Sequence, residues 1–536
     1  VKDEKRKADK VYNIDEDVMA TGTSTQIRRG RSKIYEYTKT GRTPPSVAIK
    51  LYDGKSTLPL DLKEEANILS QCDHPNIIRL YEVTKTNQKT SLVLELCMGG
   101  TLQDFVEKQT APIKEKRIIS IMRQIVSAVA YLHHNNIVHR DVELANIMFA
   151  DDSPESAVKL IDFGCATKLV TPKPGVFKFL TEKTGSIHIM APEIITQGRY
   201  GPKCDVWSIG VCAYMLCMQG KQPFKGTTVK EYENMITKSR MTFGTDWKYS
   251  NDAKKFILEC TSTSPASRLS AAQALHHVWL ENNASNNYNA SNTSNSTNTS
   301  TTTTKKFMIP NELSVSLALF QRATALKRVA LNALAMKSIG NSKYRDLFQR
   351  LDVGNTGYLT KSEFINGFTK SGLSPEELED AYIKLDVNCN DRIMYTEFLA
   401  MTMEVDDELI DNDNDGKLRE VFDILDTDHS GYITKKNLLK LLGCSKNNNT
   451  KQHDAHEIAT LKLLEHYHDE VSYENFQRLF QRGQNVKRNI DAIRESSDNE
   501  DDEEEEENEN EEMKSNFMMK KKNGYVQPPP ESSPDV

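Results

Sequence analysis

The chain has 536 residues, of which 38% are hydrophobic and 27% are charged, a composition typical of a globular protein. Its net charge is −7, but residues 491–512 hold fourteen acidic residues and one arginine, so the rest of the chain is net positive. The sequence has no concentrated basic stripe, and we expect no nucleic-acid partner. No apolar run reaches the ~18–20 residues of a membrane helix, so we expect no transmembrane segment. The longest such run, near 207–218, is expected to form a buried core helix.

The nine cysteines are scattered and include no C-x-x-C pair. Free thiols in a reducing compartment explain this pattern better than a disulfide framework or a zinc site does. We therefore expect a cytoplasmic protein, and we expect it to act as a monomer. The sequence begins with Val1 and leaves N-terminal lipidation open. It also leaves open whether the protein enters the nucleus.

Composition and periodicity divide the chain into five segments. Strand-like runs followed by helical patterns predict a folded domain over residues 12–280, and the Asn/Ser/Thr-rich segment 281–306 is expected to be a disordered linker. A junction helix with an autoregulatory role is expected within 307–339. Residues 340–482 carry four helix–loop–helix repeats, and 483–536 form an acidic tail that we expect to be disordered.

Short motifs in the first folded segment carry its chemistry. In chain order they are Val47-Ala48-Ile49-Lys50, His139-Arg140-Asp141 with Asn146 behind it, Asp162-Phe163-Gly164 and Ala191-Pro192-Glu193. Any one of them could arise by chance, but their order and spacing together resemble the eukaryotic protein kinases. The resemblance implies a bilobal α+β fold and transfer of the ATP γ-phosphate to serine or threonine of protein substrates.

The resemblance also implies a role for each residue of these motifs. Lys50 would hold the α- and β-phosphates of ATP, and Glu65 would pair with that lysine. Asp141 would accept the proton of the substrate hydroxyl. Asn146 and Asp162 would bind Mg²⁺, which prefers hard oxygen ligands.

Other positions complete or weaken this site. The main chain of Glu95 and Cys97 is implied to bind adenine. Gly22 and Ser24 lie in the remnant of a phosphate-covering loop that has lost most of its glycines, so its backbone approaches phosphates less easily. Glu143 stands where many serine/threonine kinases have a lysine on the transferred phosphate, and a carboxylate there repels that phosphate.

The repeats of the second folded segment match a calcium-binding loop, which needs oxygen ligands at fixed positions and a tight turn in the middle. The ligands that we expect are Asp352, Thr356, Tyr358 and Glu363 in the first loop, Asp386, Asn388, Asn390, Arg392 and Glu397 in the second, and Asp426, Asp428, Ser430 and Tyr432 in the third. The second loop matches best, although Asp391 replaces its turn glycine and must adopt a left-handed conformation. The third closes on Asn437, which lacks a bidentate carboxylate, and the fourth, 464–475, has lost its ligands. The loop-like run 411–416 is expected to cap a helix instead.

A kinase domain followed by a basic, amphipathic segment and four calcium-type loops resembles the calcium-dependent protein kinases of plants and protists. The residues that carry this resemblance run from Phe320-Gln321-Arg322 to Leu331. In the junction, Leu326, Val329, Ala330, Ala333 and Leu334 are expected to share one helix face. The resemblance implies an all-α, calmodulin-like EF-hand domain whose calcium-bound form engages the junction helix and relieves repression of the kinase.

Three functions stay open at this point. The leading hypothesis is a calcium-regulated serine/threonine kinase that uses ATP, Mg²⁺ and Ca²⁺. The alternative is a calcium-responsive pseudokinase or scaffold, in which Glu143 and the eroded glycine-rich loop impair phosphotransfer. A third is a kinase whose repeats no longer sense calcium.

Overall fold

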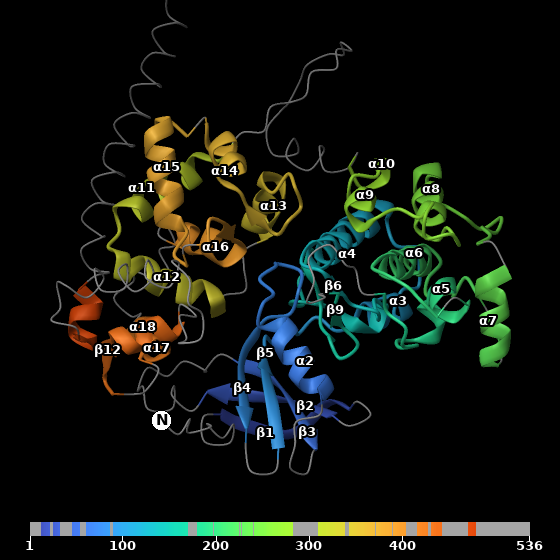
Figure 1. Cartoon of the computed structure of the whole chain (residues 1–536), viewed down its shortest axis with the longest axis horizontal. Coiled ribbons are helices and arrows are strands. Elements are labelled where there is room, and N and C mark those ends of the chain that lie inside the picture. The colour runs from blue at the N-terminus through green and yellow to red at the C-terminus, as the bar shows by residue number, and fades with distance from the viewer. Residues whose placement is uncertain are drawn as a thin grey trace, which may run out of the picture. The chain divides into compact units, whose positions relative to one another are not determined.

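The computed structural model of the chain contains two regions with regular structure, which Figure 1 shows with their elements labelled. The structure describes residues 12–21, 25–32, 46–53, 60–85, 89–169, 179–196, 198–224, 226, 228–238, 241–281, 309–337, 342–369, 371–388, 390–403, 415–426, 430–441 and 470–478. Several predictions lie outside these residues. They concern Gly22, Ser24, Asp428, most of the linker, the run 411–414, the start of the fourth loop and the acidic tail.

The first region begins with an antiparallel sheet of order β1-β2-β3-β5-β4. Its strands are β1 (Tyr12–Thr21), β2 (Thr25–Ser32), β3 (Ser46–Asp53), β4 (Leu80–Lys85) and β5 (Lys89–Leu94), and helix α2 spans Leu60–Leu69. Alternation along β3 buries Ile49 completely against Val93 of β5. The neighbouring residue in β3, Lys50, therefore points to the opposite face of the sheet.

A mainly helical lobe follows in the chain. Its helices are α3 (Leu102–Glu107), α4 (Glu115–His134), α5 (Pro192–Thr196), α6 (Lys203–Cys217), α7 (Val229–Lys238), α8 (Asn251–Cys260), α9 (Ala271–Leu275) and α10 (Val278–Glu281), with short 3-10 turns η2 (Leu144–Asn146) and η3 (Ile187–Ile189). Strands β6 (Ile137–Val138) and β7 (Ile147–Phe149) pair with β9 (Thr167–Lys168) and β8 (Val158–Leu160). From Cys204 to Cys217, α6 is buried on all sides, which confirms the predicted core helix.

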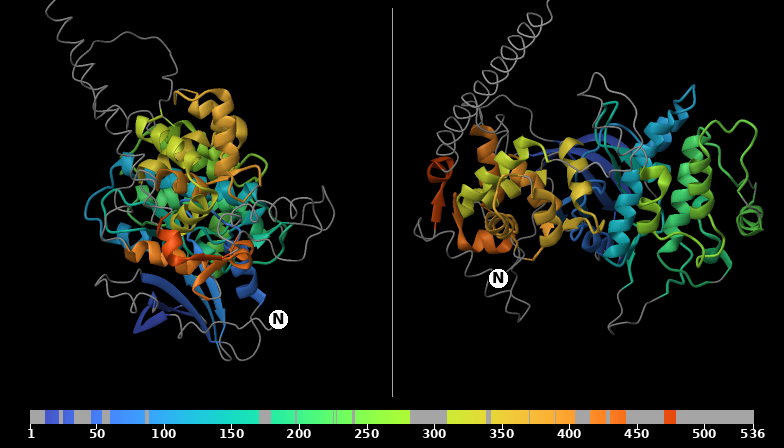
Figure 2. Two further views of the ribbon diagram at one scale, coloured as in Figure 1. Left: turned by 90° about the vertical axis from the view of Figure 1, so that its left-hand side faces the viewer. Right: turned by 90° about the horizontal axis from the view of Figure 1, so that it is seen from above.

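The second region is helical. Its elements are α11 (Asn311–Arg322), α12 (Ala325–Lys337), α13 (Ser342–Leu351), β10 (Tyr358–Leu359), α14 (Lys361–Phe368), α15 (Pro375–Leu385), β11 (Ile393–Met394), α16 (Tyr395–Thr402), α17 (Asp415–Leu425), β12 (Tyr432–Thr434), α18 (Lys435–Leu441) and β13 (Glu470–Ser472). The first two loops are joined by the β10–β11 pair, which places Tyr358 opposite Met394. Both views of Figure 2 show helices α11–α16 gathered in one group.

The junction segment differs from the single helix that the sequence suggested. It forms two helices, α11 and α12, with a break at Ala323 and Thr324. The Thr324 hydroxyl accepts a hydrogen bond of 3.3 Å from the Lys327 N–H, which is the contact of a residue that starts a new helix. All five residues of the predicted apolar face are buried: Leu326, Val329, Ala330, Ala333 and Leu334. Burial extends beyond that face, because Lys327, Leu331, Asn332 and Ala335 are buried as well. Helix α12 packs on α16 and α17.

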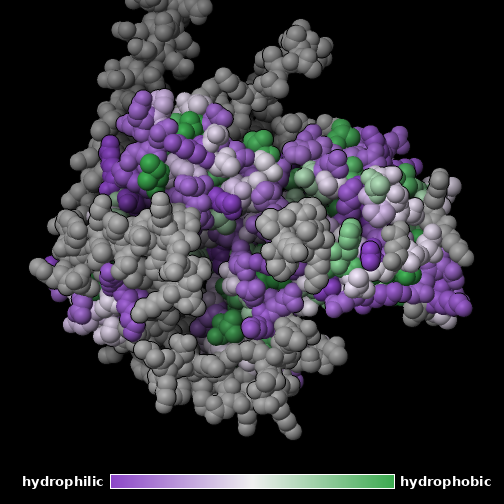
Figure 3. All heavy atoms as spheres, viewed as in Figure 1, coloured by the Kyte–Doolittle hydropathy of each residue, from purple (hydrophilic) through white to green (hydrophobic). Residues whose placement is uncertain are grey.

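The expected α+β fold followed by a helical domain is thus confirmed. Figure 3 shows a face that is mostly hydrophilic, with apolar residues scattered over it. Within the described part of the chain, no helix has both the length and the apolar character needed to cross a membrane.

Candidate active site and calcium loops

Two carboxylates from separate parts of the chain contact Lys50 of β3. The Lys50 ammonium lies 2.8 Å from a carboxylate oxygen of Glu65 on α2 and 3.0 Å from Asp162, which follows β8. The Tyr52 hydroxyl donates to the other Glu65 oxygen at 2.5 Å. Burial disfavours the charged form of Lys50, but Glu65 and Asp162 outweigh burial and raise its pKa. Lys50 is therefore a fixed positive charge at this point.

Asp162 is held as a carboxylate. Burial opposes its ionisation, but Lys50 and the Gly164 N–H, which donates a hydrogen bond of 3.0 Å, lower its pKa below the ordinary value. Its side chain keeps 46% of its surface exposed. A charged, accessible carboxylate beside a lysine suits a site for a metal ion and phosphate.

Hydrogen bonds from two separate segments hold the Asp141 carboxylate. The Ser186 N–H donates to one carboxylate oxygen at 2.8 Å, and the Asn146 side-chain amide donates to the other at 2.8 Å. Burial raises the pKa of Asp141, and the nearby charge of Glu143 raises it further, although Ser186 opposes both effects. Asp141 is thus a positioned carboxylate with enhanced affinity for a proton, as a proton acceptor requires.

A buried carboxylate of α6 fixes the backbone of this loop. Asp205, fully buried, accepts hydrogen bonds from the N–H groups of His139 at 2.9 Å and Arg140 at 2.8 Å, and from the His133 ring at 2.8 Å. Arg140 has a φ of +69°, a conformation that costs free energy and needs such support. The loop is therefore rigid where it presents Asp141.

The segment after β5 offers its main chain to a ligand. The Glu95 side chain is engaged elsewhere, because it forms an ion pair of 2.9 Å with Lys159 and accepts a hydrogen bond from the Arg79 N–H. Cys97 is buried, and burial raises the pKa of its thiol to about 12, so the thiol stays neutral. These contacts are compatible with adenine binding through the Glu95 carbonyl and the Cys97 N–H.

Sequence reasoning missed the partner of Glu143. The ring Nε2 of His188 in η3 lies 3.0 Å from a Glu143 carboxylate oxygen. The available signal was the reversed charge at Glu143 itself, because a half-buried carboxylate beside a second carboxylate calls for a nearby cation.

The second calcium loop has the features of a cation site. The Asp386 carboxylate accepts hydrogen bonds from the Asn390 and Asp391 N–H groups at 3.0 and 2.8 Å. Asp391 has a φ of +58°, which confirms that it takes the left-handed turn position. The side-chain oxygens of Asn388 and Asn390 are buried and have no hydrogen-bond partner among the residues that the structure describes. Buried oxygens without partners are costly, and a bound cation would satisfy them.

The closing glutamate of this loop is also positioned. Glu397 is 1% exposed and accepts hydrogen bonds from the Asn388 N–H at 3.2 Å and the Met394 N–H at 2.9 Å. Burial raises the pKa of Glu397 to about 8, with the Asp386 charge adding to the shift. The donor set of two carboxylates and two carboxamides fits Ca²⁺, which prefers six to eight oxygen ligands.

The first loop resembles the second in its hydrogen bonds. Asp352 accepts from the Thr356 N–H at 2.9 Å and the Gly357 N–H at 2.7 Å, and Glu363 accepts from the Gly354 N–H at 2.8 Å. Burial raises the pKa of Asp352 to about 6. Because Gly354 has no side-chain oxygen, this loop offers one ligand fewer than the second.

The third loop keeps its opening and loses its closing ligand. Asp426 accepts hydrogen bonds from Ser430 N–H at 3.1 Å and Gly431 N–H at 2.8 Å. Asn437 accepts from the Thr434 N–H at 2.8 Å and from the Thr434 hydroxyl, so its amide oxygen acts as a helix cap. A neutral amide at this position makes a weaker calcium ligand than a bidentate carboxylate.

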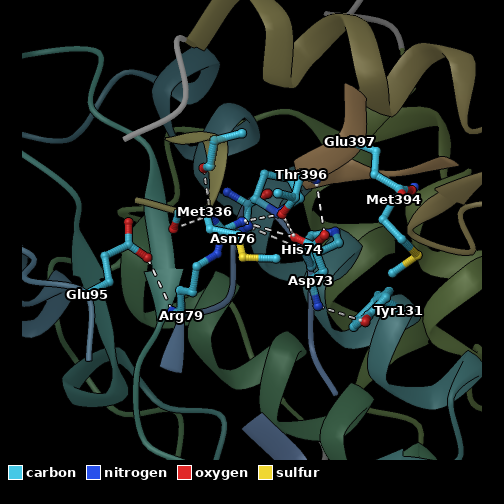
Figure 4. A network of polar contacts seen from close by, with 12 residues as sticks. Asp73, His74, Asn76, Arg79, Glu95, Tyr131, Met336, Met394, Thr396 and Glu397 are labelled. Carbon is cyan, nitrogen blue, oxygen red and sulfur yellow. Dashed lines mark hydrogen bonds and ion pairs between the residues drawn. The ribbon is translucent and has the colours of Figure 1, made fainter. Parts of the chain in front are cut away.

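Residues that the sequence did not single out link the kinase-like lobes to the helical region (Figure 4). Asp73, just after α2, accepts hydrogen bonds from the Thr396 hydroxyl at 2.8 Å and the Thr396 N–H at 3.1 Å. Arg79 pairs with Asp73 at 3.0 Å and donates to the carbonyls of Ala335 at 2.9 Å and Met336 at 2.7 Å. Arg79 therefore caps the C-terminal carbonyls of α12.

Comparison with known proteins agrees with this geometry. Residues 29–280 match the protein kinase domain, 341–403 match an EF-hand domain pair and 417–447 match an EF-hand domain. The chain is 32% identical over 446 residues to calcium-dependent protein kinase 5 of Plasmodium berghei, covering 82% of this chain and 73% of the relative. It is 33% identical over 443 residues to calcium-dependent protein kinase 5 of Plasmodium falciparum, covering 81% and 72%. Calcium-dependent protein kinase 3 of Plasmodium berghei is 28% identical over 477 residues, covering 85% of this chain and 80% of the relative.

The fold and the site thus define a protein kinase domain joined to EF-hands. The extent of the similarity goes further: this chain belongs to the calcium-dependent protein kinase family. The comparisons favour the active kinase over the pseudokinase alternative.

Proposed function

We propose that phosphotransfer in this calcium-regulated serine/threonine protein kinase is carried out by Lys50, Glu65, Asp141, Asn146 and Asp162. The observation that supports the proposal most strongly is the position of the Lys50 ammonium, 2.8 Å from Glu65 and 3.0 Å from Asp162. Protein kinases are competent for transfer only when the lysine–glutamate pair and the metal-binding aspartate are both in place.

Each residue then has a defined task. Lys50 binds the ATP phosphates, and Asn146 and Asp162 hold Mg²⁺, which neutralises charge that develops on the phosphates during transfer. Asp141 accepts the proton of the substrate hydroxyl. The hydrogen bonds from Ser186 and Asn146, both of 2.8 Å, orient the carboxylate for that task. The main chain of Glu95 and Cys97 binds adenine, and the loop with Gly22 and Ser24 covers the phosphates.

We further propose that calcium binds the first three loops, most tightly the second. The unpartnered oxygens of Asn388 and Asn390 support that ranking. Tyr358, Arg392 and Tyr432 contribute main-chain carbonyls, and Asp428 completes the third loop. The junction helices α11 and α12, which pack on the EF-hand helices α15 and α16, couple calcium binding to kinase activity. The domain boundaries are those that the sequence predicts, 12–280 for the kinase and 340–482 for the EF-hands.

We also infer that the protein is cytoplasmic and monomeric. The seven cysteines in the described part of the chain are free thiols, which suits a reducing compartment. The apolar face of α12 is covered by α16 and α17 of the same chain, so the junction needs no second copy. Light scattering of the purified protein with and without calcium measures the oligomeric state directly.

The test of the proposed function is Mg·ATP phosphotransfer to a generic serine/threonine peptide, measured with calcium and with a chelator. We expect transfer that calcium stimulates. Transfer that is indifferent to the chelator would contradict regulation through the loops. No transfer in either condition, from folded protein that still binds ATP, would point to a pseudokinase.

A further inference from the structure

An acid–imidazole pair lies beside the residues assigned to phosphotransfer. Glu143 follows Asp141 by two positions, and a carboxylate oxygen of Glu143 lies 3.0 Å from Nε2 of His188. The Glu143 side chain is 15% exposed and the His188 side chain 29% exposed, so solvent screens this pair only in part. Neither residue has a task in the transfer step described above.

The backbone on either side fixes Glu143. Val142, fully buried, accepts a hydrogen bond of 3.5 Å from the Cys212 thiol, and Leu144 is 2% exposed. The Glu143 carbonyl accepts a hydrogen bond of 3.0 Å from the Asn146 N–H. Glu143 therefore has little freedom to turn away from Asp141 by a backbone change.

The backbone that carries His188 is fixed as well. Ser186 donates its N–H to Asp141 at 2.8 Å, and the Ile189 carbonyl accepts from the Ser208 hydroxyl on α6 at 3.0 Å. Gly185 has a φ of +95°, and a Cβ there would meet the Arg140 carbonyl oxygen at 2.2 Å. This close approach brings the segment 185–189 against the catalytic loop and sets His188 opposite Glu143.

Other titratable groups of the described residues lie on the elements around the pair. The Asp141 carboxylate on the catalytic loop is one such group. Burial raises the pKa of Asp141, and the Glu143 charge raises it further. Cys212 on α6 is a second such group. Burial, and then the Glu143 charge, raise the pKa of the Cys212 thiol, so the thiol stays neutral. On α7, which also packs against η3, Glu233 lies 3.9 Å from Lys183. Among the basic side chains that the structure describes, His188 lies within hydrogen-bond reach of Glu143 and can offset its charge.

We propose that His188, when protonated, neutralises Glu143 and thereby lets the catalytic loop transfer phosphate without the usual lysine at position 143. This inference rests on the proposed function and assigns His188 as a positioning residue. A neutral imidazole leaves the Glu143 charge free to repel the γ-phosphate. An imidazolium cancels that charge where the negative phosphate must approach Asp141.

The chemical step itself is unchanged. The substrate oxygen forms a bond to the γ-phosphorus as the bond to the β-phosphate oxygen breaks, and the hydroxyl proton passes to Asp141. Protonation of His188 changes only the electrostatic potential at the reacting groups.

The experiment compares the full-length protein with Glu143→Gln, His188→Gln, His188→Lys and the double variant Glu143→Gln/His188→Gln. Transfer of phosphate from Mg·ATP to a serine/threonine peptide is measured with saturating calcium from pH 6 to pH 8. His276→Gln is the matched control, because His276 forms a similar pair of 3.1 Å with Glu281 on the surface. Thermal unfolding of each variant at pH 6 and pH 8 gives the coupling between the two side chains independently of activity.

His188→Gln should lower the rate at pH 6 about tenfold, and removing Glu143 in the double variant should restore it. His188→Lys should keep the rate within a few-fold of wild type, because it keeps a cation opposite Glu143. In thermal unfolding, the effects of the two single variants should not add up to that of the double variant, because the side chains at positions 143 and 188 are in contact.

Two outcomes would overturn the inference, and they are distinguishable. Wild-type protein that transfers phosphate, with a rate and pH profile that His188→Gln leaves unchanged, would reject the role of His188 and leave the proposed function standing. Wild-type protein that transfers no phosphate at any pH in the range would reject the proposed function, and this inference with it. A variant that loses activity by misfolding is recognised by its unfolding curve. In that case the rate of His188→Lys shows whether a cation at position 188 supports phosphotransfer.

Discussion

The hydroxyl of Thr396 donates a hydrogen bond of 2.8 Å to the carboxylate of Asp73 (Figure 4). Thr396 immediately precedes Glu397, the closing residue of the second calcium loop, and Asp73 follows the helix α2 that carries Glu65. A movement of Glu397 on calcium binding would therefore act, through one residue, on the segment behind the Lys50–Glu65 pair. This contact would give calcium a short physical route to the active site.

Replacing Thr396 with valine should weaken that route. Thr396→Val keeps the shape and the N–H contact but removes the hydroxyl, which costs about 1 kcal/mol. A loss of this size corresponds to a factor of about five in an equilibrium. We expect the calcium concentration for half-maximal phosphotransfer to rise by about that factor, measured in calcium-buffered assays.

Thr369→Val is the matched control, because the exposed Thr369 hydroxyl donates only within its own helix end, to the Asn366 carbonyl at 3.1 Å. It should leave the calcium dependence at the wild-type value. An unchanged calcium dependence in Thr396→Val as well would mean that the contact does not transmit calcium binding.

Replacing Lys50 with methionine should remove phosphotransfer while the protein stays folded. Loss of the ammonium leaves Glu65 and Asp162 without their shared cation and the ATP phosphates without theirs. Losing one such electrostatic contact costs roughly 10²–10³ in rate, and here two partners are affected. The measurement is the rate with saturating calcium, with Lys63→Met, an exposed residue of α2, as the control for changed surface charge. Substantial transfer by Lys50→Met would contradict the assignment of Lys50.

Replacing Glu397 with glutamine should weaken the second calcium site. The substitution keeps the shape of the side chain but removes the bidentate carboxylate that closes the loop. We expect calcium affinity at this site to fall at least about tenfold, measured by titration calorimetry on the full chain.

Glu377→Gln provides the matched control for this substitution. Glu377 caps the start of α15 through the Ser374 N–H at 2.8 Å, as Glu397 caps α16 through the Met394 N–H at 2.9 Å, but it closes no calcium loop. It should bind calcium like wild type. Equal calcium binding by the two variants would show that the second loop holds no ion.

The sequence predicts those parts of the site in which each residue's task is tied to a short local motif. Lys50, Asp141 and Asp162 come from such motifs, and the structure brings Lys50 to both Glu65 and Asp162. The left-handed conformation of Asp391 could be predicted, because it stands at the turn position of the loop and aspartate is one of the few residues other than glycine that tolerate a φ of +58°.

Other contacts depend on chain segments that are distant in sequence. Asp73 and Thr396 are separated by 323 positions, and neither belongs to a motif. His188 contacts Glu143 only because Gly185 lets the chain turn back against Arg140. Such pairings follow from tertiary packing, so local patterns cannot reveal them. The break in the junction was accessible, because Thr324 before a helical run is a start signal.

A buried histidine in the kinase region should make stability depend on pH. His74 is 5% exposed, and its ring contacts the Ser127 hydroxyl at 3.1 Å and accepts a hydrogen bond from the Asn76 N–H at 3.1 Å. Burial, and then the charge of Lys159, lower the pKa of His74 to about 3. In the unfolded chain a histidine has a pKa of about 6.5. The folded protein therefore binds fewer protons than the unfolded chain between these two values.

The sign of the effect follows from this difference in bound protons. Stability from the neutral His74 is fully present above about pH 6.5 and is lost as the pH falls toward about 3. From pH 6.5 to pH 5 the free energy of unfolding should fall by about 1.5 kcal/mol more in wild type than in His74→Gln. Urea unfolding followed by tryptophan fluorescence reports on this region, because the three tryptophans are Trp207, Trp247 and Trp279. His276→Gln, with a side chain 57% exposed, should keep the wild-type slope, and an equal slope in His74→Gln would show that His74 does not resist protonation in the folded protein.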